Sequence, residues 1–206
     1  MGTRRLSYPV KCILVVITTC TVLWQGCIHL SPTCWRIWRD NALHRAIDRG
    51  DTHAVRIWLK EGANPNGYYE VEQYPACRMG PSPILVYAAT DGRAAIVSEL
   101  LDKGANINAA DLDGQTALIT ACEFIKPLTA RNLIARGADV QAKDIQGRTA
   151  LMLAAETGQV DLVDLLLSKG SNVAAKDQDG DTAQSYAKRS GHRNIVSRLQ
   201  HVTVRN

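Results

Sequence analysis

Residues 141–174 read QAKDIQGRTALMLAAETGQVDLVDLLLSKGSNVA, and this stretch decides the fold. Related stretches lie on both sides of it at a fixed interval. Three series of landmark residues each keep a spacing of 33: Gly114, Gly147 and Gly180; Thr116, Thr149 and Thr182; and Gly104, Gly137 and Gly170. Self-similarity at one fixed period predicts an array of stacked repeats, in which each unit contacts its neighbours in sequence.

The motif within one period resembles the ankyrin repeat. The residues that carry the resemblance are DIQGRTALMLAAETG (144–158), followed by the apolar run VDLVDLLLSKG (160–170). The family pattern is a short turn, a T-x-L-x-x-A-A helix, a second helix and a loop back to the next unit. The resemblance implies an all-α solenoid of about five helix-turn-helix units, and it implies a protein that binds other proteins.

The repeats divide the chain into segments. We expect units at about 41–66, 83–108, 109–141, 142–174 and 175–202, an insertion at 67–82, and a linker or N-terminal cap at 27–40. Asn41 stands where other units have threonine, so it is expected to cap the first helix of unit one. The last unit carries polar residues where inner units carry apolar ones, which is typical of a terminal cap with a solvated outer face.

Two units depart from the motif at the helix ends. Pro83 replaces the threonine of unit two, which suits the first turn of a helix because an N–H is not needed there. In unit three, Ile125 and Pro127 stand where unit four has Gly158 and Val160. We therefore expect the turn between the helices of unit three to differ in shape but not in length.

The N-terminus has the composition of a signal or anchor. Three basic residues precede the apolar run CILVVITTCTVLW (12–24), which is shorter than the roughly 20 residues that span a bilayer. Gln25, Gly26 and Cys27 follow, and this order resembles a bacterial lipoprotein signal, which implies lipidation of Cys27. The alternative is an uncleaved anchor that extends through Leu30. Either form of residues 1–26 predicts a membrane-anchored protein whose repeats face the periplasm or another extracytoplasmic space.

The distribution of charge argues against nucleic-acid binding. The net charge is +4, and residues 1–40 account for all of it with five basic residues and one acidic residue. The repeats are therefore neutral overall, whereas nucleic-acid binding depends on clustered positive charge. We expect a monomer that binds a protein partner and no nucleic acid.

No motif in the sequence predicts catalysis, a cofactor or a metal site. The five histidines lack ligand spacing, and no nucleophile elbow or phosphate-binding loop occurs. The aspartates Asp111, Asp144 and Asp177 recur with the repeat, so we assign them to turns. We expect Cys122 to be a buried free thiol, while Cys34 and Cys77 could form a disulfide in an oxidising compartment.

The leading hypothesis is a non-enzymatic binding module, tethered to a membrane and exported. A dedicated inhibitor or immunity-type protein is an alternative that would bind one partner tightly. An accessory subunit of an envelope enzyme is a third, with functional groups in the insertion. The expected partner-binding residues come from the insertion, from the hairpin tips and from the inner helices: Tyr68, Tyr69, Tyr74 and Arg78; Thr90 and Asp91; Leu112, Asp113, Gln115, Glu123 and Phe124; and Ile145, Gln146, Arg148, Glu156 and Thr157.

Overall fold

The computed structural model describes residues 32–69 and 82–203. The chain divides into two units, residues 1–38 and residues 39–206, and each is considered by itself. The elements in chain order are α2 (Pro32–Asp48), α3 (Thr52–Lys60), β1 (Tyr68–Tyr69), β2 (Ser82–Pro83), α4 (Ile84–Thr90), α5 (Ala94–Asp102), α6 (Ala117–Glu123), α7 (Pro127–Ala135), α8 (Ala150–Glu156), α9 (Val160–Ser168), α10 (Ala183–Arg189) and α11 (Arg193–Thr203).

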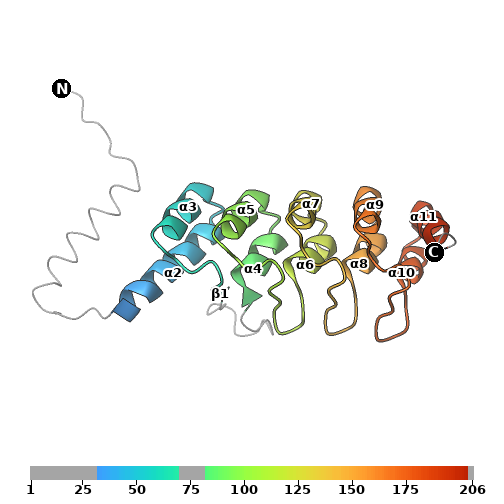
Figure 1. Ribbon diagram of the computed structural model, residues 1–206, viewed down its shortest axis with the longest axis horizontal. Helices are drawn as coiled ribbons and strands as arrows, with labels where there is room; N and C mark the ends of the chain where they lie inside the picture. The colour runs from blue at the N-terminus through green and yellow to red at the C-terminus, as the bar shows by residue number, and fades with distance from the viewer. Residues whose placement is uncertain (1–31, 70–81, 204–206) are drawn as a thin grey trace, which may run out of the picture. The chain divides into compact units, whose positions relative to one another are not determined.

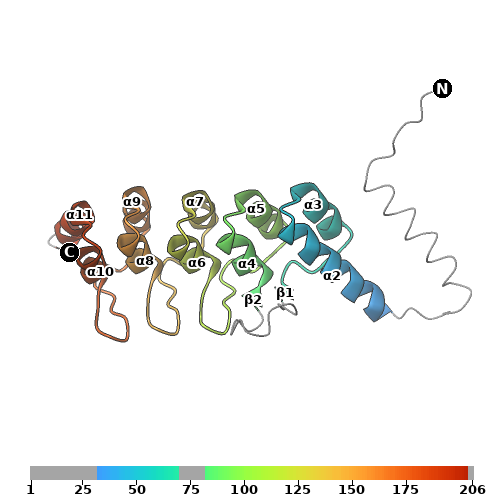
Figure 2. The ribbon, with the colours of Figure 1, turned by 180° about the vertical axis from the view of Figure 1, so that it is seen from behind.

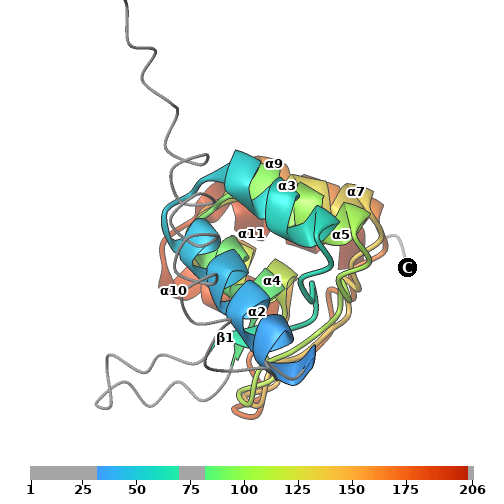
Figure 3. The same ribbon diagram turned by 90° about the vertical axis from the view of Figure 1, so that its left-hand side faces the viewer.

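From residue 39 onward, successive helix pairs form a row, which Figures 1 and 2 show from its two sides. The view along the row in Figure 3 separates the helices into two layers. The outer helices α3, α5, α7 and α9 lie in one layer, and inner helices such as α4 and α10 lie in the other. The predicted all-α repeat solenoid is confirmed. β1 and β2 add a two-residue antiparallel pairing, Tyr68 with Pro83 and Tyr69 with Ser82.

The inner helices α6, α8 and α10 each begin with a threonine cap, and α6 and α8 continue with residues that are buried on all sides. Thr116, Thr149 and Thr182 each accept the N–H of the residue three positions later, at 3.4 Å. This is the N-cap interaction that helix starts require. Residues 150–155 of α8 are all buried, because units on both sides cover them. Ala88, Ala121, Ala154 and Ala187 are fully buried, and their small side chains let neighbouring inner helices approach closely.

The first inner helix differs from the expectation. Asn41 was expected to cap it, but α2 begins at Pro32 and Asn41 lies in its interior. The expectation failed because it assumed that the threonine position of the other units marks a helix start here too.

Trp35 and Trp38, three residues apart in α2, stack with ring centroids 5.1 Å apart and ring planes at 19°.

The turn between inner and outer helix keeps one backbone shape in all units. Gly50, Gly92, Gly158 and Gly191 have φ between 68° and 78°, and Ile125 has φ 55° at the same position. In unit three the N–H of Lys126 donates to the carbonyl of Ala121 at 2.8 Å, as the N–H of Gln159 does to that of Ala154 at 3.0 Å. The expected change of shape at Ile125 was therefore wrong. Ile125 instead adopts a left-handed backbone conformation, which is unfavourable for a β-branched residue.

Side chains from the following unit complete several of these turns. Arg93 donates to the carbonyl of Asp48 at 2.9 Å, and Gln159 donates to that of Cys122 at 2.8 Å. The ring nitrogen Nε2 of His192 lies 3.0 Å from the carbonyl of Glu156. These groups donate to, or face, carbonyls at the end of the preceding inner helix, where the regular helical hydrogen bonds stop; that of Cys122 also accepts the N–H of Ile125. Packing is close there, since a Cβ on Gly158 would lie 2.6 Å from the ring of His192.

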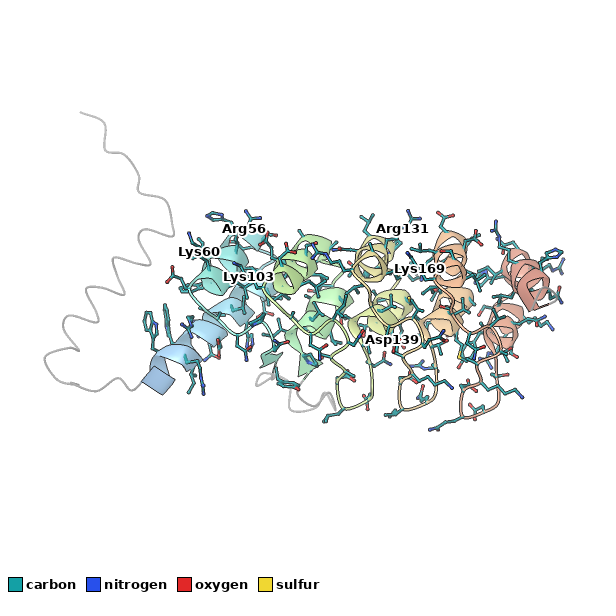
Figure 4. The ribbon with its side chains drawn as sticks, viewed as in Figure 1. Arg56, Lys60, Lys103, Arg131, Asp139 and Lys169 are labelled. Atoms are coloured by element: carbon teal, nitrogen blue, oxygen red, sulfur yellow. The ribbon has the colours of Figure 1, made fainter. Side chains whose placement is uncertain are left out.

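Ion pairs connect neighbouring outer helices along the layer in which Figure 4 labels Arg56 and Arg131. The pairs are Arg56 with Glu99, Arg136 with Asp102, Arg131 with Asp161, and Arg198 with Asp164. Apart from Glu99, the side chains of these pairs are at least one-third exposed, so solvent screens the attraction between the charges. The charged side chains of these four pairs are therefore engaged with each other.

Long hairpin loops join α5, α7 and α9 to the next inner helix, and one aspartate organises each of these three loops. Asp111 accepts the N–H groups of Asp113 and Gln115, at 2.9 and 2.8 Å. Asp144 and Asp177 accept the equivalent pairs in the next two hairpins. The assignment of these aspartates to turn chemistry is confirmed.

Cys122 is fully buried in α6 and carries a free thiol, as expected. Burial raises the pKa of this thiol to about 12, because the thiolate would lose its hydration. A thiol in this state is not a nucleophile near neutral pH. Its role is that of a small apolar side chain in the core.

We predict that Ile125→Gly stabilises the protein. A left-handed backbone costs a β-branched residue about 1–2 kcal/mol. The extra chain entropy that glycine loses on folding costs less, about 0.5–1 kcal/mol. Ile145→Gly is the matched control: Ile145 is 56% exposed against 57% for Ile125, and its φ is not positive. Urea unfolding should show opposite signs for the two variants. A lower unfolding free energy for Ile125→Gly would contradict the claim that the backbone of Ile125 is strained.

We predict that Tyr186 makes stability depend on pH at alkaline values. Its hydroxyl donates to Asp177 at 2.7 Å, and burial followed by this hydrogen bond raises the pKa of Tyr186 to about 12. Because the unfolded value is about 10, the contribution is complete below pH of about 10 and is lost as the pH rises through about 12. Tyr186→Phe should therefore show a shallower decrease in unfolding free energy between these values. If the unfolding free energies measured with urea fall equally steeply with pH in both proteins, the assignment is contradicted.

Candidate functional site

The candidate interface begins with the row of hairpins, which project together from one edge of the repeat array (Figure 1). Backbone hydrogen bonds join their tips. The N–H of Ile145 donates to the carbonyl of Asp113, and the N–H of Gln178 donates to that of Gln146, each at 2.9 Å. Because the tips are joined backbone to backbone, their side chains keep a fixed spacing along the row.

Leu112 and Ile145 occupy the same position on successive hairpins, and both are exposed. The exposed fractions are 71% for Leu112 and 56% for Ile145. Asp113 and Gln146, the next residues in each hairpin, are also exposed. A pair of large apolar side chains held at repeat spacing on a rigid edge is a surface that can bind a partner.

Gln115 and Arg148 were expected to bind a partner, but the structure shows both engaged within the fold. Gln115 donates to the buried carboxylate of Asp144 at 3.3 Å, and Arg148 donates to the same oxygen at 2.7 Å. Arg148 also reaches Glu123 of the preceding unit at 3.4 Å. Burial lowers the pKa of Arg148, but the hydrogen bond and the charge of Asp144 outweigh it, so the pKa is raised. The array itself therefore engages the side-chain amide N–H of Gln115 and the guanidinium of Arg148.

The inner-helix candidates of the neighbouring units are also partly engaged. Thr90 donates its hydroxyl to the carbonyl of Val86 at 3.1 Å, and Thr157 donates to that of Leu153 at 2.7 Å. Asp91 forms an ion pair with Arg93 at 2.8 Å, and the backbone carbonyl of Glu156 faces His192. Of these residues, only Asp91 is exposed.

A second exposed apolar group lies at the turn between α6 and α7. Phe124, which was expected from the sequence to bind a partner, is 47% exposed and is the C-cap residue of α6. Ile125 and Leu128 lie beside it in sequence, with exposed fractions of 57% and 73%. Sequence reasoning missed these two residues as surface candidates. The signal was available by register, because Leu128 aligns with Asp161 of the next unit.

The predicted sites in the insertion are described only at its edges. Tyr68 is 57% exposed and lies in β1, beside a hollow of about 340 Å³ that is also lined by Asn66, Pro83 and Asn106. The backbone of Tyr69 pairs with Ser82. Tyr74, Arg78, Cys77 and the lipidation candidate Cys27 lie outside the described residues, so the partner, disulfide and lipid expectations for them remain predictions. Cys34 is placed in α2 by its backbone only.

The described residues hold no arrangement typical of a metal centre. Within residues 32–69 and 82–203, no group of three or more His, Cys, Asp and Glu side chains is placed to hold an ion. Within the same ranges, no helix is both long enough and apolar enough to cross a bilayer. The candidate site is defined instead by the exposed apolar residues Leu112, Phe124 and Ile145 of units three and four.

Comparison with known proteins identifies the repeats. The family described as "Ankyrin repeats (3 copies)" matches residues 22–111, 43–144 and 126–205. The rabbit (Oryctolagus cuniculus) "Ankyrin repeat, SAM and basic leucine zipper domain-containing protein 1" is 36% identical over 84 residues, which is 41% of this chain and 16% of that protein. The human "Ankyrin repeat and SOCS box protein 1" is 34% identical over 94 residues, which is 46% of this chain and 27% of that protein.

Each relative shares only part of its length with this chain, at most 27% of the relative. The similarity therefore concerns the repeats and not the further domains that their names mention. Ankyrin repeats generally serve as protein-binding modules without catalytic activity. On the matched family regions, which together span most of the chain, this protein belongs to the ankyrin-repeat family.

Proposed function

We propose that this protein is an exported, membrane-tethered binding module that recognises a protein partner through apolar side chains on units three and four. The observation that carries the proposal is the pair Leu112 and Ile145, which lie on successive hairpin tips with exposed fractions of 71% and 56%. The fold does not require large apolar side chains at these positions, since unit five has Gln178 at the same place in its hairpin.

The polar groups around this pair support the assignment to a protein partner. Gln115 and Arg148 are engaged with Asp144, so they brace the hairpins, while Leu112 and Ile145 remain accessible at the tips together with Asp113 and Gln146. Charge on the outer helices is distributed over pairs of both signs. An apolar edge on a neutral array favours a partner with its own apolar surface over a polyanion.

The composition of the leader supports the membrane tether and export. All of the net positive charge lies in residues 1–40, and three basic residues precede the apolar run 12–24. Basic residues before an apolar segment stay on the cytoplasmic side, so the segment that follows would be translocated. The repeats would then meet their partner outside the cytoplasm.

We predict that a photo-crosslinking amino acid at position 112 or 145 captures the same partner. p-Benzoylphenylalanine would replace Leu112 or Ile145 in cells that make the protein, and the same replacement at Ile57 is the control. Ile57 is an exposed apolar residue of outer helix α3, with an exposed fraction of 36%. One shared crosslinked species at 112 and 145, absent at 57, is the expected result. Equal capture at all three positions, or at position 57 alone, would contradict the proposed surface.

We predict that the protein extracted from cells is found in the membrane fraction with one of two intact masses. A mass lacking residues 1–26 and carrying added acyl chains identifies a lipoprotein linked through Cys27. The full mass identifies an uncleaved anchor. Recovery of the protein in the soluble fraction would overturn the tether while leaving the binding surface to be judged by the crosslinking.

A further inference from the structure

The N-terminal turns of α2 carry large apolar side chains that face solvent on more than one side of the helix. Within residues 1–38, the exposed fractions are 51% for Trp35, 56% for Ile37 and 37% for Trp38. Trp35 and Trp38 share one side, where their rings stack at 5.1 Å. Ile37 is two residues from Trp35, about 200° around the helix, so it lies on the other side.

Large apolar side chains exposed on two sides of the start of α2 are expected to contact something apolar. Indole rings combine a large apolar body with one N–H donor, which is why tryptophan concentrates at membrane–water interfaces. The exposed Arg36 lies between these residues, and α2 has no acidic residue in its first turn. A guanidinium group on a flexible stem pairs well with a phosphate oxygen.

The distance along the chain limits how far this helix can be from a membrane anchor. Trp35 lies eight positions after Cys27 and five positions after Leu30. Fully extended chains of these lengths reach at most roughly 29 Å and 18 Å. The headgroup region on each side of a bilayer is about 5–8 Å thick. A tether at either position therefore keeps Trp35 and Trp38 within reach of the membrane surface.

We propose that Trp35, Arg36, Ile37 and Trp38 lie in the headgroup region of a bilayer that contains anionic phospholipid. The two indoles and Ile37 enter the boundary between headgroups and acyl chains, and Arg36 pairs with lipid phosphate. This surface holds the start of α2 at the membrane, so it deepens the membrane tether proposed above and depends on it.

The test measures tryptophan fluorescence of the membrane-extracted chain in vesicles of phosphatidylcholine and phosphatidylglycerol, 7:3, with brominated acyl chains. Trp24→Phe with Trp58→Phe leaves Trp35 and Trp38 as the only indoles. The matched control replaces Trp24, Trp35 and Trp38 by Phe and leaves Trp58 of α3. Circular dichroism and urea unfolding check that both backgrounds fold.

The expected result is that brominated lipid quenches at least half of the Trp35 and Trp38 emission and little of the Trp58 emission. Arg36→Gln should reduce the quenching in phosphatidylglycerol vesicles more than in vesicles of phosphatidylcholine alone. If the chain floats with the vesicles but Trp35 and Trp38 emit as in water without quenching, the interfacial contact is overturned and the tether stands. If the chain does not float with the vesicles, the tether itself has failed, and the contact fails with it.

Discussion

No helix pair in this protein can bury its apolar side chains by itself, and the rest of the structure depends on that constraint. The six residues 150–155 of α8 are all buried, which is possible only because another unit packs against each side. Burial at about 25 cal/mol per Å² must offset a chain entropy of roughly 1–2 kcal/mol per residue. A unit of two short helices reaches that balance only when it is stacked.

The same constraint explains which interactions join the units. Inner helices meet through alanines such as Ala121 and Ala154, which leave little space between backbones. At this separation, a side chain from one unit can reach the helix end of the unit before it, as Arg93 and Gln159 do. The hairpin aspartates act locally, but Asp144 also accepts Gln115 from the previous hairpin. Stacking thus brings polar groups of neighbouring units into contact.

Most of the fold could be predicted from the sequence, because period, caps and burial all follow from residue type at a fixed register. Thr149 and Ala154 are examples: one caps a helix and the other is buried, as their positions indicate. The turn at Ile125 was predicted wrongly because hydrogen bonds from the Lys126 N–H to Ala121 and from the Gln159 side chain to Cys122 hold a backbone shape that local preference opposes. The start of α2 was missed because no repeat landmark extends before residue 41.

The candidate site could be predicted only in part. Register shows which residues point away from the core, and it placed Leu112 and Ile145 correctly on the surface. It does not show which outward polar side chains find a partner in the next unit. Arg148 looks available in sequence, yet it reaches Glu123, 25 residues earlier. Such contacts depend on distances between units, which a linear sequence does not contain.

The backbone links between hairpin tips have a consequence for binding kinetics. Because Ile145 and Asp113 are joined by a main-chain hydrogen bond, the tips lose little conformational entropy when a partner docks. A preorganised edge of this kind should associate with closely related partners at similar rates. Differences in affinity among partners, or among variants of one partner, would then reside mainly in how long each complex lasts.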